Sequence, residues 1–227
     1  LNALEASKLQ AIDATDIAGI SVSNLAKINE TQISNLSIEQ IKALTVAQIK
    51  SLTPAQVSNL TLNQFSVLST ADIVVMNSAQ IQNVGYEKLN ALNSSQVQAL
   101  STSVISSLTE AQLSHLEASQ LTSMATSQIR ALTSEQVKNL HSDLLQALNA
   151  LQIQALNTSA ISNLSFEQIA AFDTTQIVAL NSAQVKALSS DQINHLDIES
   201  LQAIESSDVA AISNEAIASI SSDQIAN

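Results

Sequence analysis

The chain has 227 residues, a net charge of −12 and 45% apolar residues, but only 2% aromatic residues, two glycines, one proline and no cysteine. The lack of cysteine excludes a disulfide framework and a thiolate metal site. The scattered acidic charge opposes binding to nucleic acid and to anionic membranes, and no apolar run reaches the roughly 20 residues of a membrane span. We therefore expect neither a nucleic-acid partner nor membrane insertion.

The sequence repeats every eight residues along its whole length. A column of glutamines shows the period best: Gln32, Gln40, Gln48, Gln56, Gln64, Gln80, Gln96, Gln168, Gln176, Gln184, Gln192 and Gln224. The residue after this column is apolar in every octad, and so is the residue three positions later. No insertion or deletion interrupts these columns, so we predict about twenty-eight octads in a single domain over residues 1–227 without an internal boundary.

Each octad carries the start signals of a helix. Its first position is mostly Ser, Thr, Asn or Asp, the preferred N-cap residues, as at Thr45, Thr53, Thr61, Asn77, Thr109, Thr133, Ser165, Asp173 and Asp197. Glutamine three residues later completes a capping box, in which its side chain accepts from the N–H of the cap residue. Pro54 falls at the first helical position, where its missing N–H costs nothing. The octads are therefore predicted to start one short helix each.

The eight-residue period excludes two other secondary structures, a single long helix and a strand. In one long helix an octad would rotate the apolar stripe by about 80° per repeat, so the stripe could not stay buried. A strand requires apolar residues at every second position, which the octads lack. We therefore predict an all-α fold, a solenoid or superhelix of capped helices of about seven residues, each stable only through its neighbours.

A slower period lies on top of the octads. The seventh position is usually Ala or Ser, but larger polar residues recur every three or four octads, at Asn35, Asn59, Asn83, His115, Asn139, Asn163 and His195. The second position carries bulky residues at Ile38, Leu62, Tyr86, Phe166 and Ile198. These spacings predict a coil of about 3.3 octads, or about 27 residues, with the Asn and His positions along one edge. The alternative explanation of this slower period is chance variation among small polar residues.

No constellation of catalytic, cofactor-binding or metal-binding residues is evident. His115 and His195 lie ten octads apart without a second ligand at a suitable spacing, and His141 replaces a capping residue. We interpret His115 and His195 as exposed substitutions for Asn. Two glycines cannot build a phosphate loop, and no G-x-S-x-G sequence is present. We expect no catalytic, cofactor or metal site, and therefore no enzyme.

The octads resemble those of a known class of repeats. The segments LTVAQI (44–49), LTPAQV (52–57) and LTSEQV (132–137) resemble the LTxxQ(I/V)xAL tandem repeats of very large secreted or surface bacterial proteins, some with adhesin-like or haem-utilisation labels. The resemblance implies an extracellular or cell-surface location and a role as stalk, spacer or adhesive fibre. Leu1 falls within an octad, so we expect a segment processed or excised from a longer chain.

Two functions remain open from the sequence. The first is a structural, non-catalytic segment that contacts neighbouring repeats of a longer chain or associates end to end through the apolar residues Leu1, Leu4, Ile217, Ile220 and Ile225. The second is a scaffold that binds a protein or glycan along one face. A binding scaffold should carry an exposed patch that does not repeat, whereas a spacer should look alike on every coil. Exposed Tyr86 and Phe166 are the hints of such a patch.

Overall fold

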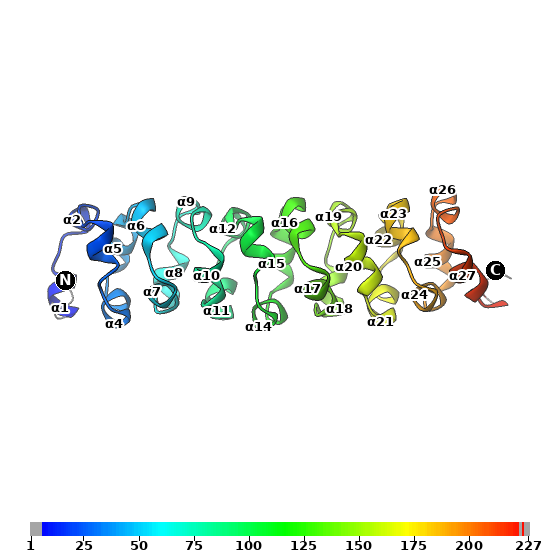
Figure 1. Ribbon diagram of the computed structural model, residues 1–227, viewed down its shortest axis with the longest axis horizontal. Helices are drawn as coiled ribbons and strands as arrows, with labels where there is room; N and C mark the ends of the chain where they lie inside the picture. Colours follow the sequence, from blue (N-terminus) through cyan, green and yellow to red (C-terminus); the bar gives the residue numbers. More distant parts are fainter. Residues whose placement is uncertain (1–5, 223, 225–227) are drawn as a thin grey trace. The chain divides into compact units, whose positions relative to one another are not determined.

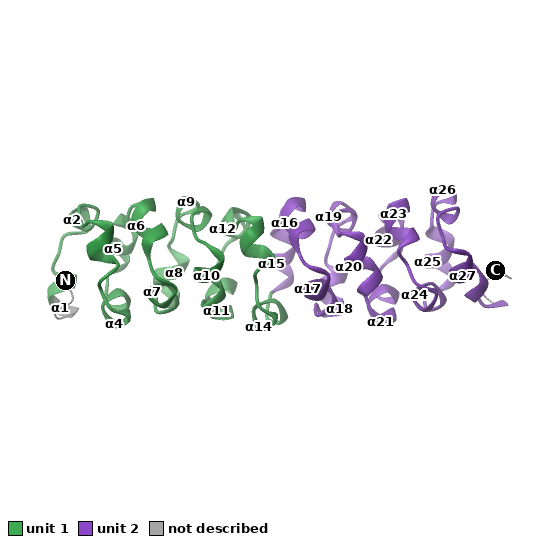
Figure 2. Cartoon of the chain, in the orientation of Figure 1, with its two compact units in different colours: residues 1–116 green, residues 117–227 purple. Residues whose placement is uncertain are grey.

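A computed structural model describes residues 6–222 and residue 224, and in that part of the chain it contains short α-helices and no strand (Figure 1). The contacts group the chain into unit 1, residues 1–116, and unit 2, residues 117–227 (Figure 2). The octad register runs through residue 117 without an insertion. The single domain without internal boundary stays a prediction.

The described part of the chain forms one helix per octad, as predicted. Unit 1 contains α1 (Ala6–Gln10), α2 (Ala14–Ile17), α3 (Val22–Leu25), α4 (Glu30–Ser34), α5 (Ile38–Ala43), α6 (Val46–Ser51), α7 (Pro54–Ser58), α8 (Leu62–Ser66), α9 (Thr70–Val74), α10 (Ser78–Gln82), α11 (Tyr86–Asn90), α12 (Ser94–Ala99), α13 (Thr102–Ile105) and α14 (Glu110–Ser114). Unit 2 contains α15 (Ala118–Ser123), α16 (Thr126–Ala131), α17 (Ser134–Lys138), α18 (Ser142–Gln146), α19 (Ala150–Ala155), α20 (Thr158–Asn163), α21 (Phe166–Ala170), α22 (Thr174–Val178), α23 (Ser182–Lys186), α24 (Ser190–Asn194), α25 (Ile198–Ala203), α26 (Ser206–Val209) and α27 (Asn214–Ser219).

The helices have four to six residues and are shorter than the predicted seven, because two to four residues of each octad lie in the turn. After α5 the backbone of Leu44 is extended, with φ −60° and ψ 134°, and the next cap, Thr45, is extended as well, with φ −75° and ψ 154°. Among the described residues no backbone has a positive φ. Ordinary L-residues can therefore make every one of these turns, which explains how so many turns are built with so little glycine.

The two apolar columns form the core of each unit, as predicted. In the first column Ile33, Ile81 and Ile153 are fully buried, and in the second Leu60 and Leu132 are 1% exposed. Val209 and Ile217, in α26 and α27, are exposed exceptions at 43% and 44%. Of the apolar residues expected at the ends, Leu1, Leu4 and Ile225 lie outside the described residues.

Within each unit a helix packs on the helix three further along the chain. In unit 1 α7 packs on α10 and α9 on α12, and in unit 2 α17 packs on α20 and α24 on α27. Hydrogen bonds from the glutamine column reach the octad four positions earlier, as from Gln40 to Leu9. One coil therefore takes between three and four octads, and the predicted 3.3 lies inside this interval. The predicted all-α solenoid is confirmed.

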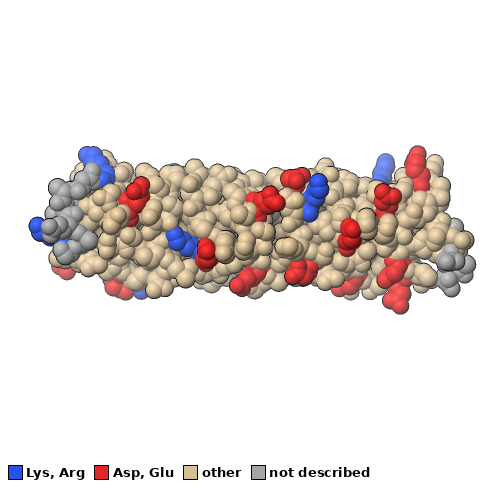
Figure 3. Space-filling view, turned by 90° about the horizontal axis from the view of Figure 1, so that it is seen from below, with Lys and Arg blue, Asp and Glu red and all other residues tan. Residues whose placement is uncertain are grey.

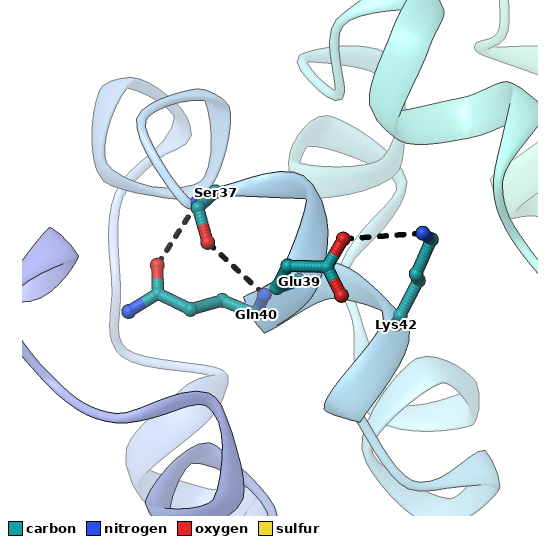
Figure 4. A network of polar contacts seen from close by, with 4 residues as sticks. All are labelled: Ser37, Glu39, Gln40 and Lys42. Carbon is teal, nitrogen blue, oxygen red and sulfur yellow. Dashed lines mark hydrogen bonds and ion pairs between the residues drawn. The ribbon is translucent and has the colours of Figure 1, made fainter.

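The capping boxes form as predicted. In α5 the N–H of Ser37 donates to Gln40 Oε1 over 2.9 Å, and the N–H of Gln40 donates to Ser37 Oγ over 3.1 Å (Figure 4). All nine N-caps named from the sequence accept a helix N–H in this way, at Thr45, Thr53, Thr61, Asn77, Thr109, Thr133, Ser165, Asp173 and Asp197. His141 lies at the N-cap of α18, but its side chain makes no capping bond. His141 therefore replaces a capping residue, as predicted, and does not supply the capping bond itself.

We predict that the box at Ser189 and Gln192 is non-additive. Ser189→Ala removes the 3.2 Å bond from the Gln192 N–H and should cost about 0.5–2 kcal/mol of unfolding free energy. Gln192→Ala should cost more, because it also removes the bonds to Ile161 and Leu164 of an earlier coil. The double variant should lose less than the sum, since both changes break one box. Urea denaturation of the four proteins measures this coupling, and strict additivity would contradict it.

Candidate binding surface

The glutamine column joins successive coils in addition to capping helices. In unit 2, Gln184 Oε1 accepts from the Asn181 N–H at 3.0 Å, while Gln184 Nε2 donates to the carbonyl oxygens of Ile153 and Leu156, both at 2.8 Å. In unit 1, Gln40 Nε2 donates likewise to Leu9 and Ile12, at 2.8 and 2.7 Å. The side-chain oxygen of one glutamine therefore caps its own helix, and its side-chain nitrogen donates hydrogen bonds to an earlier coil.

This double role explains why the column is glutamine. Glutamate has the same length but lacks a donor, and asparagine is shorter by one methylene. The carbonyls that receive the bonds lie 28 and 31 residues earlier, and the bonds satisfy backbone oxygens that would otherwise be buried without partners. The glutamines of the column from Gln32 to Gln192 are themselves buried, and Gln80 is fully so. This column therefore holds the fold together and is not a surface for a ligand.

Asp72 and Lys88 of unit 1 stand in place of glutamine in the column, and each keeps part of its contacts. Asp72 still accepts from the Ser69 N–H at 2.8 Å, but its carboxylate has no hydrogen to donate to the earlier coil. Lys88 does the reverse: its Nζ donates to the Ser58 carbonyl oxygen of the earlier coil, and it cannot accept from the cap, which is Gly85. Burial lowers the pKa of Lys88, and the nearby Glu87 carboxylate opposes this in part. Each residue thus performs half of the glutamine's role.

We predict that Lys88→Gln stabilises unit 1 by about 1 kcal/mol, because the amide restores both hydrogen bonds without a buried charge. The folded-state pKa of Lys88 lies below its unfolded value, so the unfolded state binds more protons in the window between them. The stability of the natural chain should therefore rise as pH increases through this window, and the rise should vanish in Lys88→Gln. Thermal melts at neutral and alkaline pH measure both effects. A Lys88→Gln variant that is less stable than the natural chain would contradict the prediction that glutamine restores both hydrogen bonds.

Six residues of the slow column share one local role: Asn35, Asn59, Asn83, His115, Asn163 and His195. Asn35 Nδ2 and Asn83 Nδ2 donate to the carbonyl four residues earlier, at 2.7 and 2.9 Å. His115 Nδ1 and His195 Nδ1 contact the equivalent carbonyls at 2.9 and 2.7 Å. In each case the side chain closes the last turn of its helix. Both histidines are exposed and occupy the place of Asn, as the sequence predicted.

Each unit carries one stacked pair of rings at its surface. In unit 1 the ring centroids of Tyr86 and His115 are 3.9 Å apart at 17°, and in unit 2 those of Phe166 and His195 are 4.1 Å apart at 27°. Tyr86 and Phe166 keep 36% and 42% of their surface exposed, so the predicted exposure of these residues is confirmed. The stacking was not predicted from the sequence. The two pairs have the same sequence spacing, which is the signal that indicates stacking. In both, the histidine follows the aromatic residue by three whole octads plus the step from the second to the seventh position of an octad.

Polar groups lie beside both ring pairs. A backbone carbonyl only accepts, so the contact with the carbonyl places a hydrogen on Nδ1 of each histidine. Beside the unit 2 pair, a hydrogen bond from Ser165, one from its own backbone N–H and the charge of His195 lower the pKa of the Glu167 carboxyl. No group of three or more His, Asp or Glu side chains within residues 6–222 and 224 could hold a metal ion.

Charged side chains are dispersed over the surface in view in Figure 3. Acidic side chains are scattered over the face of each unit in view and do not gather in one patch (Figure 3). Lys42 and Glu39 form an exposed ion pair at 3.2 Å in α5 (Figure 4), which contributes little stability. None of the helices in the described ranges has the length and apolar character of a membrane span.

The octads of unit 2 also relate the chain to a known repeat. Residues 167–197 match the family model of the ALTTAQ repeat. The chain contains short tandem repeats of this kind. The matched segment includes AFDTTQ (171–176), ALNSAQ (179–184) and ALSSDQ (187–192), in which Ala and then Leu or Phe of one octad precede the cap and glutamine of the next. No curated protein matches the chain.

Proposed function

We propose that this chain is a structural, non-catalytic stalk or spacer segment of a bacterial extracellular or cell-surface protein. The observation that supports this most is the glutamine bond pair between coils, which recurs in unit 1 at Gln40, Gln56 and Gln112 and in unit 2 at Gln176 and Gln192. Within each unit, coils are thus attached to earlier ones by the same neutral hydrogen bonds. Such an arrangement can be extended by adding octads without a new kind of contact.

Single-molecule stretching tests this role. Held between two handle domains, the chain should resist force and then lengthen in steps of one coil or a multiple of it. One coil of about 27 residues releases about 90–100 Å of extended chain. Gln184→Ala should lower the force of the affected steps, whereas the exposed Asn194→Ala should leave it unchanged. A chain that extends without measurable resistance would rule out a mechanical spacer.

The location is proposed from the resemblance of the octads to repeats of secreted and surface proteins of bacteria. The test is whether antibodies against this segment label intact bacteria that produce the protein. Labelling that requires permeabilised cells would reject the location and leave the spacer role untouched.

For partners, we propose neighbouring repeats or a second copy of the chain stacked end to end. Leu201, Ile204, Val209, Ile212 and Ile220 line an apolar hollow of about 250 Å³ in unit 2. Added salt should promote association by screening the −12 charge, and Ile220→Lys should reduce it. Sedimentation velocity measures this. A monomer at high concentration in both low and high salt would exclude self-association but not contacts within a longer chain.

The second candidate is a scaffold that binds a protein or glycan along one face. The two ring pairs favour it, because exposed aromatic rings are common at binding surfaces. Glycan-array binding by the chain should be lost in the double variant Tyr86→Ala, Phe166→Ala. His195→Asn is the matched comparison, since it removes one ring and keeps a side chain that can close the helix. No binding, or equal binding by all three proteins, would reject this candidate.

A further inference from the structure

Two residues of unit 2 break the octad pattern and meet at one hollow. The third position of the octads is small or polar everywhere except at Leu151, and Arg130 is the sole arginine of the chain. Leu151 is 66% exposed, the highest value among the exposed large apolar residues of the described chain. Arg130 on α16 and Leu151 on α19 line the same hollow of about 300 Å³, where α16 packs on α19.

The rest of this hollow consists of a small floor and neutral polar groups. Ala155 is 3% exposed, and Thr126, Gln154 and Asn181 complete the lining. Asn181 Oδ1 already accepts from the N–H groups of Ala183 and Gln184, both at 3.1 Å, so its Nδ2 remains as a donor. No carboxylate lines the hollow. Hydrogen-bond donors therefore surround an exposed aliphatic side chain.

The Arg130 side chain has no hydrogen bond or ion pair with any residue in the described ranges 6–222 and 224. At a hollow lined by neutral groups, an unpaired guanidinium favours a planar anion that it can bind through two parallel hydrogen bonds. Leu151 adds apolar surface beside it, which a small inorganic anion cannot cover. A spacer has no structural need for either residue, since other octads do without both.

We propose that this hollow binds a peptide carboxylate next to an aliphatic side chain. Arg130 holds the carboxylate, Leu151 contacts the aliphatic group, and Gln154 and Asn181 bond the peptide amide. The carboxylate comes either from a chain terminus or from an Asp or Glu side chain, and both have the same chemistry. This inference does not depend on the spacer role, because a single binding hollow can lie on a structural segment.

The test uses three peptides: acetyl-Ser-Ala-Leu with a free carboxylate, the same peptide as its amide, and acetyl-Asp-Leu amide. Binding is followed through the NMR shifts of the Ala155 backbone and the Gln154 and Asn181 side-chain amides. Binding by the first peptide alone identifies a chain terminus, and binding by the third an acidic side chain. Equal shifts with all three peptides, or no shifts at all, would overturn the proposal.

Matched variants separate the site from general attraction. Arg130→Gln should weaken binding at least tenfold, and Arg130→Lys should weaken it several-fold, because an ammonium keeps the charge but loses the planar fork. Leu151→Ser, which restores a residue common at this position, should also weaken it several-fold. Lys138→Gln removes a cation on α17 and should leave binding unchanged. An equal effect of Lys138→Gln and Arg130→Gln would show unspecific attraction to an acidic peptide and overturn the site. All three side chains are exposed, so circular dichroism should show an unchanged fold.

Discussion

Gln184→Glu should destabilise unit 2 by at least about 3 kcal/mol at neutral pH, because a buried charge is left unpaired. The side chain is 1% exposed, and its Nε2 donates to two carbonyl oxygens. A carboxylate there would lose both bonds and face those oxygens with like polarity. Chemical denaturation followed by circular dichroism gives the free energy of unfolding.

The pH dependence of this variant has a definite sign. Burial beside carbonyl oxygens should raise the folded-state pKa of the new glutamate above its unfolded value. The folded state then binds more protons in the window between the two values, so stability should fall as pH rises through it. At acid pH the protonated carboxyl regains one donor, and the deficit should shrink.

Two matched variants isolate the cause. Gln184→Ala loses both donor bonds, and the bond from the Asn181 N–H as well, but adds no charge, so it should cost less at neutral pH and show no such pH dependence. Asn194→Asp makes the same change from amide to carboxylate at an exposed position and should change stability by less than about 0.5 kcal/mol. A Gln184→Glu variant as stable as the natural chain would show that the intercoil bonds do not hold the coils together.

Ile129→Asp should unfold several octads together. Ile129 is fully buried in the first apolar column, and Leu100, at 6% exposure, is the equivalent test in the second column of unit 1. Truncating a buried isoleucine alone costs about 2–5 kcal/mol, and a buried carboxylate adds a desolvation penalty. Helices this short are unstable alone, so loss of one contact surface releases its neighbours as well.

Hydrogen exchange reports how far the unfolding spreads, and circular dichroism reports how much helix is lost. The loss should extend beyond α16 to the helices that pack against it. Ser127→Asp is the control in the same octad, since this exposed position lies in the first turn of α16, where a carboxylate is favourable. An unchanged melting curve for Ile129→Asp would contradict a core shared between coils.

The sequence predicted the local features well because they depend on contacts within one octad. A cap such as Ser37 and its partner Gln40 are three residues apart, so the residue types alone indicate the bond. Helix length was overestimated, because nothing in the residue types shows that Leu44 already has an extended backbone. The slow column led to a coil of about 3.3 octads, since its spacing reflects which octads lie on the same side.

The candidate surfaces were harder to predict. Tyr86 and Phe166 stood out as exposed bulky residues, but their partners His115 and His195 were interpreted only as replacements for Asn. Recognising the stacking requires knowing which position of the next coil lies over the second position of an octad. Arg130 and Leu151 belong to octads that are not adjacent in the sequence, and nothing in their spacing indicates that they share a hollow.

The sequence by itself thus determined the octad period, the helix starts and the buried columns, because capping and apolar periodicity are local. Only the tertiary structure decided where the other half of each glutamine amide goes. The partners of Gln184 are backbone carbonyls 28 and 31 residues earlier, and every residue has a carbonyl, so no residue type marks them. The coil brings them within reach, and its pitch follows from how the helices pack.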